Sequence, residues 1–567
     1  MSSVIPSPAD CVGVPDGFRT RRRPLFSRGC VLGGLISLTA ITLTVACGGS
    51  QTPSGSQTPA ATVLPIKTST PSTSPRAIPA ALGQRATIFG AESEDHASAL
   101  ATGDFNGDGI PDLLLAAAFG GGPQNARPSA GEAYLSFGPF APGESRDAGT
   151  AEQDVTIYGA DGDDQLGRAV AAGDVNGDGI DDIVVGVPSA DGPDEGRADA
   201  GEAYVIFGSA ALPPTIDLAT AVPDVTIYGT RAGDLAGFAL EVADFNGDGT
   251  SDVMISAFRA GGLLNDRPEA GQAYVILGSR DLAAAIDLAV EAPDMVITGA
   301  EAGDWLGETI TAGDLNGDGL DDLVLAANFA DGPDDARDRA GETYVIAGSH
   351  SLPASIDLAS DRPQITVYGK DPGDQIGHSL ATGDVNGDGF DDLLLGAVSA
   401  NGPENSRRLA GEAYLVSGSR TLPETVDAAA DEAALLIYAP DTVDRLGRSV
   451  GLGDVNGDGN DDLLLGLPGG DGLREELENA GDLLIVLGGA GLMGTMDMAS
   501  DSADLGAAGE DAGDGLTVEV FGRPPLLTFD MNGDGRDEIL VSAADADGPD
   551  NGRPGAGEAY ILFPEPD

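Results

Sequence analysis

Seven short acidic segments carry the side chains best suited to bind a metal ion. Each follows the pattern Asp-x-Asn-Gly-Asp-Gly-x-x-Asp or a close variant. Places 1, 3, 5 and 9 of such a loop offer side-chain oxygens, and the backbone carbonyl of place 7 adds one more. Ligation by oxygen alone selects a hard cation, and many oxygens on a bendable loop favour calcium over magnesium. The pattern therefore predicts up to seven calcium sites.

The predicted side-chain ligands are Asp104, Asn106, Asp108, Asp112; Asp174, Asn176, Asp178, Asp182; Asp244, Asn246, Asp248, Asp252; Asp314, Asn316, Asp318, Asp322; Asp384, Asn386, Asp388, Asp392; Asp454, Asn456, Asp458, Asp462; and Asp530, Asn532, Asp534, Glu538. The predicted carbonyl ligands are Ile110, Ile180, Thr250, Leu320, Phe390, Asn460 and Arg536. The last loop departs twice, because Glu538 is longer than Asp and Arg536 brings a positive charge.

An acidic turn that never binds metal is the alternative interpretation of these loops. Three carboxylates crowded within ~6 Å repel one another unless a cation lies among them, which favours the metal. No recurrent histidine or base accompanies the loops. We therefore expect calcium to stabilise the structure, not to catalyse a reaction, and no catalytic residue is predicted.

The spacing of the loops reveals a long repeat. Successive loops begin 70 residues apart from Asp104 to Asp454, and the last begins 76 residues later at Asp530. A second phrase, such as Gly131-Glu132-Ala133-Tyr134, starts 27 residues after each loop begins. We number the repeat units 1 to 7 by their acidic loops. Such a period predicts a repeat architecture.

The apolar runs inside each unit predict the architecture. The run after each loop, such as residues 182–186, has the length and β-branched content of a buried strand. It forms a hairpin with the strand before the loop, and segments such as 201–208 and 155–159 supply a third and a fourth strand. Four strands make a propeller blade, so we predict an all-β, closed propeller of seven four-stranded blades. The last unit lacks a fourth strand, and we expect residues 85–89 to complete that blade and close the ring.

The phrases Ile88-Phe89-Gly90 and Gly186-Val187-Pro188 flank the acidic loops. Together with the loops they resemble the FG-GAP repeats of the integrin α-chain propeller and its bacterial relatives, over about residues 84–567. The Phe-Gly position is altered in residues 297–299, 438–440 and 507–509. In integrins the face opposite the calcium loops binds ligand, but a shared fold does not by itself transfer that function.

The N-terminus has the composition of an export signal. Residues 1–47 place arginines before an apolar stretch at 30–46, and the box that ends at Cys47 resembles a bacterial lipoprotein cleavage site, which implies lipidation of Cys47. An uncleaved anchor is the alternative, and the general and twin-arginine export routes both stay open. Residues 48–83 are rich in Ser, Thr and Pro and predict a disordered stalk before the propeller at 84–567. We expect an extracytoplasmic protein, at the cell surface or in the periplasm, lipid-anchored through Cys47.

The charge balance excludes two classes of partner. The chain has 92 acidic residues against 29 Lys and Arg, a net charge of -63. Nucleic acid and anionic lipid both require a basic face, so we expect no nucleic-acid partner and membrane contact only through the N-terminal anchor. An acid-rich proteome in a saline habitat also produces such a charge, but it does not place acids at a fixed spacing. All three cysteines precede residue 48, so the body of the protein has no disulfide.

Strands alternate in direction, so the acidic loops lie on one face of the propeller. An arginine recurs on the opposite face, at Arg127, Arg197, Arg267, Arg337, Arg407 and Arg553, with Leu477 in unit 6. An aspartate recurs there at Asp95, Asp164, Asp234, Asp304, Asp374, Asp444 and Asp514. We expect these arginines and aspartates to pair with one another. Residues that break the repeat are the candidates for contact with a partner: Trp305, His96, His378 and the insertion around 521–525.

We predict a monomeric, calcium-stabilised module for binding or adhesion, without catalysis of its own. Its ligand is expected to be an unknown protein or glycan on the face opposite the acidic loops. The alternatives are an extracytoplasmic hydrolase or lyase on a propeller scaffold and a structural component of the cell envelope. The chain has 3 histidines and no nucleophile elbow, which argues against an enzyme.

Overall fold

Short runs of Val, Ile, Leu and Ala form strands, and these strands assemble into seven sheets. The computed structural model describes residues 80–564 apart from 83, 474–476 and 518–525. The chain divides into Met1–Thr70, which lies wholly outside the described residues, and Pro71–Asp567, which contains all of them. The predicted export signal, Cys47 and the insertion around 521–525 therefore lie outside the described residues, as does most of the predicted stalk.

Each sheet is one blade, and its strands are named in order from the first strand of its unit to the fifth. Blade 1 contains β3 (Ala99–Gly103), β4 (Asp112–Ala117), β5 (Glu132–Ser136), β7 (Val155–Tyr158) and β11 (Thr215–Asp217). Blade 2 contains β8 (Val170–Gly173), β9 (Asp182–Val187), β10 (Glu202–Ile206), β12 (Val225–Tyr228) and β16 (Ala285–Asp287). Blade 3 contains β13 (Leu240–Ala243), β14 (Asp252–Ala257), β15 (Gln272–Ile276), β17 (Met295–Thr298) and β21 (Ser355–Asp357). Blade 4 contains β18 (Ile310–Gly313), β19 (Asp322–Ala327), β20 (Glu342–Ile346), β22 (Ile365–Tyr368) and β26 (Thr425–Asp427).

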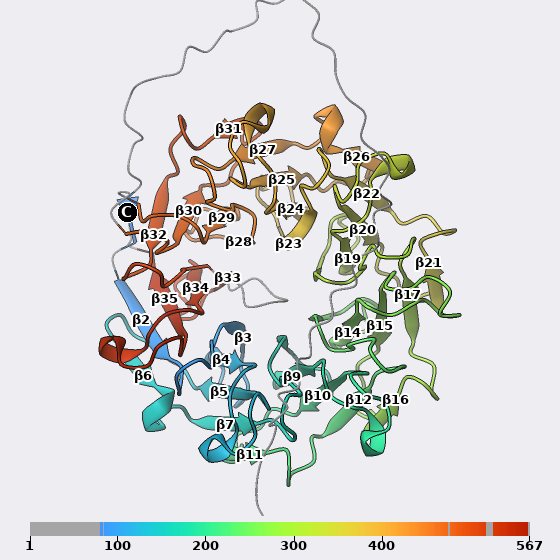
Figure 1. Ribbon diagram of the computed structural model, residues 1–567, viewed down its shortest axis with the longest axis vertical. Coiled ribbons are helices and arrows are strands. Elements are labelled where there is room, and N and C mark those ends of the chain that lie inside the picture. The colour runs from blue at the N-terminus through green and yellow to red at the C-terminus, as the bar shows by residue number, and fades with distance from the viewer. Residues whose placement is uncertain (1–79, 83, 474–476, 518–525, 565–567) are drawn as a thin grey trace, which may run out of the picture. The chain divides into compact units, whose positions relative to one another are not determined.

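The remaining three blades follow the same order. Blade 5 contains β23 (Ile376–Gly383), β24 (Asp392–Ala397), β25 (Glu412–Val416), β27 (Leu435–Tyr438) and β31 (Gly494–Asp497). Blade 6 contains β28 (Ser449–Gly453), β29 (Asp462–Leu467), β30 (Asp482–Val486), β32 (Leu505–Ala508) and β1 (Ala80–Ala81). Blade 7 contains β33 (Leu526–Phe529), β34 (Glu538–Ala543), β35 (Glu558–Phe563), β2 (Gln84–Phe89) and β6 (Ser145–Asp147). The prediction of an all-β, seven-bladed propeller is confirmed (Figure 1).

The fifth strand of each blade is a feature that the sequence did not predict. In blade 1 the first four strands pair antiparallel, and β11 then pairs parallel with β7, with Ile216 opposite Ile157. In chain order β11 lies between β10 and β12, so it belongs to unit 2. Each blade is therefore covered at its outer edge by a strand from the next unit, which leaves the fourth strand with both neighbours.

The N-terminal segment closes the ring. β2 pairs antiparallel with β35 along its whole length, from Gln84 opposite Phe563 to Phe89 opposite Glu558, which confirms the predicted closure by residues 85–89. β1 pairs parallel with β32, so Ala80 and Ala81, which the sequence placed in the stalk, belong to blade 6. The first strands of neighbouring blades contact each other around the ring, including β33 and β3 (Figure 1).

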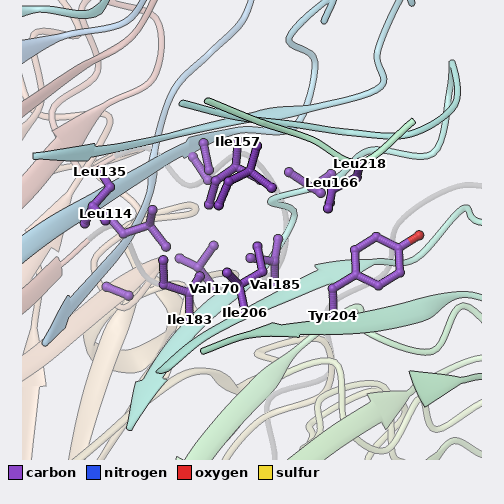
Figure 2. Packing of buried hydrophobic residues seen from close by; sticks show 14 of the residues in the cluster. Leu114, Leu135, Ile157, Leu166, Val170, Ile183, Val185, Tyr204, Ile206 and Leu218 are labelled. Carbon is purple, nitrogen blue, oxygen red and sulfur yellow. The ribbon is translucent and has the colours of Figure 1, made fainter. Parts of the chain in front are cut away.

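The core lies between the faces of neighbouring blades. Leu114, Leu135 and Ile157 of blade 1 pack against Ile183 and Val185 of blade 2 (Figure 2). Six further clusters join the other neighbouring blades in the same way. The second strand of each blade is buried on both faces, which explains its nearly continuous apolar run. Burial of each such Leu or Ile side chain contributes about 1.5–3 kcal/mol.

The described residues contain helical structure only as 3₁₀ turns of three residues. Five of them follow the second strand of a unit: η1 (Pro123–Asn125), η3 (Pro193–Glu195), η4 (Pro333–Asp335), η5 (Pro403–Asn405) and η7 (Pro549–Asn551). Two follow the fifth strand of a blade, η2 (Ala148–Thr150) and η6 (Ala428–Ala430). Across the described residues, no helix has the length and apolar character needed to cross a membrane.

Candidate metal-binding loops and the opposite face

Each acidic loop joins the first and second strands of its unit, as predicted, and its carboxylates organise the loop backbone. In the first loop the Asp104 carboxylate accepts hydrogen bonds from the backbone N–H of Asp108 at 3.0 Å and of Gly109 at 2.7 Å. Asp108 accepts one from the N–H of Ile110 at 2.9 Å. Asp112 is fully buried and accepts hydrogen bonds from the N–H groups of Phe105 at 3.1 Å and Gly138 at 2.9 Å. The loop is therefore held as a compact turn around its acidic side chains.

The glycines at places 4 and 6 are required by the backbone. Gly107 and Gly109 have φ values of 73° and 81°, a region that favours glycine. A Cβ on Gly107 would also lie 3.0 Å from Cδ1 of Ile180, the place-7 residue of the next unit. The same closeness recurs at the place-4 glycines of units 2 to 6, so each acidic loop from unit 1 to unit 6 packs against the loop of the next unit.

Place 8 of the loop has a role that sequence reasoning missed. The Asp181 carboxylate accepts a hydrogen bond from the N–H of Asp104 at 2.9 Å, and the N–H of Asp181 donates to the Asp104 carbonyl at 3.3 Å. The same carboxylate link recurs from Asp321 to Asp244, from Asp391 to Asp314 and from Asp537 to Asp454. The repeated Asp at place 8 was visible in the sequence, but its partner could be identified only once neighbouring loops were seen side by side.

The electrostatics of the loops suit a bound cation. The pKa of Asp112 is raised to about 7, chiefly by burial and also by the negative charges of Asp108 and Asp104, against the opposing effect of the hydrogen bond from the Gly138 N–H. The place-9 residues of the other units behave alike: Asp182, Asp252, Asp322, Asp462 and Glu538 have a pKa raised to about 7, and Asp392 to about 6. A cation among these oxygens would remove the repulsion that opposes ionisation.

The donor set fits calcium, although the side chains do not converge as they would around an ion. Within the described residues, no three His, Cys, Asp or Glu side chains are grouped closely enough for a metal site. In the first loop Nδ2 of Asn106 donates to both oxygens of Asp112, at 3.3 and 3.2 Å. Calcium would require the amide oxygen of Asn106, not Nδ2, to face the loop centre. Calcium ligation by these residues stays a prediction.

The seventh loop keeps the same internal bonds despite its substitutions. Glu538 is buried and accepts a hydrogen bond from the N–H of Met531 at 2.8 Å, as place 9 does in other units. The side chain of Arg536 lies against Gly457 in the loop of unit 6. Its positive charge is therefore placed beside the neighbouring loop as well as its own.

The recurrent arginines of the opposite face do not pair with the predicted aspartates. Arg337 donates two hydrogen bonds to the Asp427 carboxylate, at 2.8 and 2.7 Å, and a third to the Gly369 carbonyl. Asp427 is the last residue of β26, the fifth strand of the same blade. The other pairs are Arg127 with Asp217, Arg197 with Asp287, Arg267 with Asp357, Arg407 with Asp497 and Arg553 with Asp147. The predicted pairing was wrong because these partners lie on fifth strands.

Unit 6 lacks the arginine of this ion pair, because Leu477 occupies its place. The strand that covers blade 6 is β1, with Ala81 opposite Gly506. The ion pair that the recurrent arginine forms in the other six units is therefore absent from unit 6.

The recurrent aspartates of the opposite face close their own turns instead. Asp374 accepts a hydrogen bond from the N–H of Asp371 at 3.1 Å, and Asp304 accepts one from Glu301 at 3.2 Å. Asp374 is 2 % exposed. Burial, and after it the charge of Glu412, raise the pKa of Asp374 to about 7. This position is therefore architectural, and its carboxyl is easier to protonate than an exposed one.

Among the described residues that break the repeat, Trp305, His96 and His378 lie in different parts of the ring. Trp305 lies in an aromatic group with Phe258 and Phe329, at centroid distances of 5.3 and 4.3 Å. His96 lies between blades 1 and 7, with Nδ1 3.1 Å from the Ala544 carbonyl and 3.3 Å from the Asp545 carboxylate. The Asp545 hydrogen bond raises the pKa of His96. The His378 carbonyl accepts a hydrogen bond from the Thr309 hydroxyl at 2.9 Å.

Comparison with known proteins places the repeat in a family. The family described as FG-GAP repeat matches residues 96–136, 166–206, 306–346, 376–413 and 446–486. The chain carries FG-GAP repeats. Each matched FG-GAP segment runs from just before the first strand of a blade into its third strand, and so contains one acidic loop. The resemblance expected from the sequence is confirmed.

Proteins similar to this chain include phosphatidylinositol-glycan-specific phospholipases D and integrin alpha chains. Mouse phosphatidylinositol-glycan-specific phospholipase D is 28% identical over 395 residues, which cover 67% of this chain and 43% of the relative. Integrin alpha pat-2 of Caenorhabditis briggsae is 29% identical over 254 residues, 41% of this chain and 18% of the relative. A solved rhamnogalacturonan lyase aligns over 84% of this chain and 91% of its own with 12% identity and a TM-score of 0.31, which supports no conclusion. The chain spans less than half the length of the curated relatives that it matches.

Proposed function

We propose that this protein is an extracytoplasmic binding module without catalytic activity, in which calcium in the acidic loops stabilises the propeller and the opposite face contacts a ligand. The observation that carries the proposal is the division of the two faces. The acidic loops keep Asp, Asn and Asp at places 1, 3 and 5 in every unit, and neighbouring loops are linked by hydrogen bonds such as that from Asp104 to Asp181. On the opposite face the architectural residues recur, whereas others, such as Trp305, do not.

Calcium would act in each loop through the chain's own oxygens. Asp104, Asn106, Asp108 and Asp112 would hold the ion in unit 1, with the carbonyl of Ile110. The ion would supply positive charge among carboxylates that otherwise repel, and the neighbouring loops would be fixed with it. In a chain whose propeller has no disulfide, this would replace covalent cross-links.

Removal of calcium is the test of this role. A ligand present at about 100 times its Kd stabilises the folded state by roughly 2.7 kcal/mol per site, so the loss of several sites should lower Tm by about 10 °C or more. We expect this drop when a chelator is added, with recovery on addition of excess calcium but not magnesium. A melting curve that does not respond to the chelator would rule out the structural calcium.

A hydrolase is the second candidate, because the phospholipase D relatives are enzymes that match over 67% of this chain. The matched part is 43% of that enzyme, so its activity does not transfer to this chain. Turnover of phosphodiesters or polysaccharides by the purified chain, lost on substitution of acids outside the loops, would favour the enzyme. We expect no turnover by the purified chain. We expect the same chain to bind a ligand in glycan-array and pull-down experiments.

We also propose that the protein is monomeric and is tethered to the membrane through lipidated Cys47. The support is the composition of residues 1–47 and the lipoprotein-like box that ends at Cys47. Metabolic labelling with a radioactive fatty acid should mark the wild-type protein and leave Cys47→Ser unlabelled. Equal labelling of both proteins would contradict the anchor.

A further inference from the structure

A pocket of about 320 Å³ opens where blades 2, 3 and 4 meet. The residues that line it lie just before the first strand or just after the second strand of a blade. The acidic loops join the other ends of these two strands, so the pocket lies on the face opposite the acidic loops. This volume is near the lower end of the range for small-molecule pockets, roughly 300–1,000 Å³, and suits one compact ring system. Its lining includes Trp305, Phe258, Phe238, Arg168, Arg259 and Glu308.

A continuous group of aromatic rings forms the apolar part of this pocket. The rings of Phe238 and Phe258 are 4.3 Å apart, and those of Phe258 and Trp305 are 5.3 Å apart. Phe238 and Phe258 are buried, whereas Trp305 is half-buried. Phe258 and Phe329, whose ring centroids lie 5.3 and 4.3 Å from that of Trp305, hold the indole in place, and its half-burial leaves part of it available to a ligand.

Charged groups lie at the edge of the same pocket. The Arg168 guanidinium lies 4.6 Å from the ring centroid of Phe238, and that of Arg259 lies 5.4 Å from the centroid of Phe258. Arg259 is exposed. The pocket is lined by two guanidinium groups and by one carboxylate, that of Glu308, in a chain of net charge -63. The pocket is therefore locally suited to an anionic group.

The backbone fixes the place of Trp305 while its side chain differs between units. Trp305 has a φ of 62°, in the left-handed region. The equivalent residues of the other units are His96 at 51°, Gln165 at 62°, Leu235 at 59°, Gln375 at 58°, Arg445 at 59° and Gly515 at 61°. This backbone conformation costs a non-glycine residue about 1 kcal/mol or more. It is nevertheless the same in each of these units, although the side chain differs. The fold presents a variable side chain at a fixed position, and only unit 4 has tryptophan there.

We propose that this pocket binds a pyranose sugar residue that carries a carboxylate, a proposal that rests on the binding role proposed for this face. The C–H groups on one face of a pyranose are weakly positive and complement the negative face of the indole of Trp305. The Arg168 and Arg259 guanidinium groups match the planar carboxylate, and Glu308 can accept hydrogen bonds from the sugar hydroxyls. The ligand class is therefore an acidic polysaccharide, read one sugar residue at a time.

Trp305 provides a direct readout because it is the only tryptophan of the chain. The full chain is titrated with trigalacturonate, with maltotriose and with an acidic tripeptide, at about 0.15 M salt, where the Debye length of about 8 Å screens remote acidic residues. We expect trigalacturonate to change the Trp305 emission and to saturate. Maltotriose and the tripeptide should bind at least tenfold more weakly.

Two variants and a matched control test the residues. Arg259→Ala should weaken trigalacturonate binding at least tenfold, and Trp305→Ala should abolish it in calorimetry. Arg445→Ala alters the exposed equivalent of Trp305 in unit 6 and should leave binding unchanged. The Tm and its calcium dependence should match the wild type in all three, so that a loss of binding is not a loss of folding.

Three outcomes would overturn the sugar site. They are no response to trigalacturonate in the folded protein, equal binding by the Arg259→Ala variant, and tighter binding of the tripeptide than of either sugar. If a partner captured in pull-down still binds the Trp305→Ala variant, the binding role stands and this pocket is wrong. If chelation leaves Tm unchanged while trigalacturonate still binds, the pocket stands without the calcium role.

Discussion

The recurrent arginine is the side chain that joins three segments of the chain. Arg337 leaves the connection after the second strand, reaches the Gly369 carbonyl beyond the fourth strand and meets Asp427 at the end of the fifth. Its side chain is only 15% exposed, so the pair is partly shielded from water. A two-point, partly buried ion pair of this kind is stronger than a pair on the open surface.

A double-mutant cycle on this pair should measure its coupling. We expect Arg337→Ala to destabilise the protein by about 2–3 kcal/mol, with a coupling to Asp427→Ala of about 1–2 kcal/mol in urea unfolding. Arg362 and Glu424 form the matched control, because they lie 2.8 Å apart with side chains 84% and 83% exposed. Their coupling should stay under about 0.5 kcal/mol. Equal coupling in the two cycles would show that shielding does not strengthen the Arg337 pair.

The buried carboxyl of Asp374 should make stability depend on pH. Its pKa is raised from 3.8 to about 7 by burial and by Glu412, so the folded state binds a proton more tightly than the unfolded state. Asp374 therefore costs stability above about pH 7, and this cost falls as the pH drops and vanishes below about pH 4. Asp374→Asn should raise Tm by about 1–3 °C at pH 8 and by nothing at pH 4.

The control for this experiment is Asp338→Asn, since the Asp338 side chain is 78% exposed. It removes a carboxylate with little burial and should leave Tm within about 1 °C of the wild type at both pH values. A rise in Tm for Asp374→Asn that persists at pH 4 would mean that the effect comes from packing and not from ionisation.

At the scale of strands and loops, the sequence predicted the elements that recur within each unit. It did not predict the strands and ion pairs that join one unit to the next. The hairpin around each acidic loop was predictable because polar ligand places alternate with an apolar run long enough to identify. The fifth strand was not, because Thr215–Asp217 is three residues long and has no apolar pattern of its own. The arginine pairs were missed for the same reason, since their aspartates lie on those strands.

The pairing of β2 with β35 yields a prediction about an element. A chain that begins at Gly90 lacks β2 and leaves β35 with an unpaired edge beside Ala559 and Ile561, both buried in the closed ring. We expect it to lose at least about 10 °C in Tm and to self-associate in light scattering, because an exposed apolar edge pairs with other chains. A peptide of residues 80–90 added in trans should restore the melting curve.

A chain that begins at Ala80 is the control for this truncation, because it keeps both β1 and β2. It should melt like the full-length protein. If the chain that begins at Gly90 is equally stable and monomeric, β2 does not close the ring in solution.

At the scale of the whole molecule, the repeated residues build the propeller, and the residues that differ between units form the candidate binding site. The seven blades, their number and their closure were predictable because identical spacing leaves little freedom in how the units stack. The pocket at Trp305 was not, because it forms only where residues of units 2, 3 and 4 meet, although the single tryptophan marked the region. A binding site on a repeated scaffold is expected where the repeat fails.

The pairing of the first long strand with the last also sets an order of events during synthesis. β2 leaves the ribosome before the rest of the propeller and must wait for β35, which is synthesised only after the strands of the other blades. A chain that stops before β35 cannot pair β2, so the ring closes only when all seven blades have been made. A nascent chain cut short within the propeller by damage to its message would remain open and be exposed to proteases, which makes closure a check on synthesis of the whole propeller.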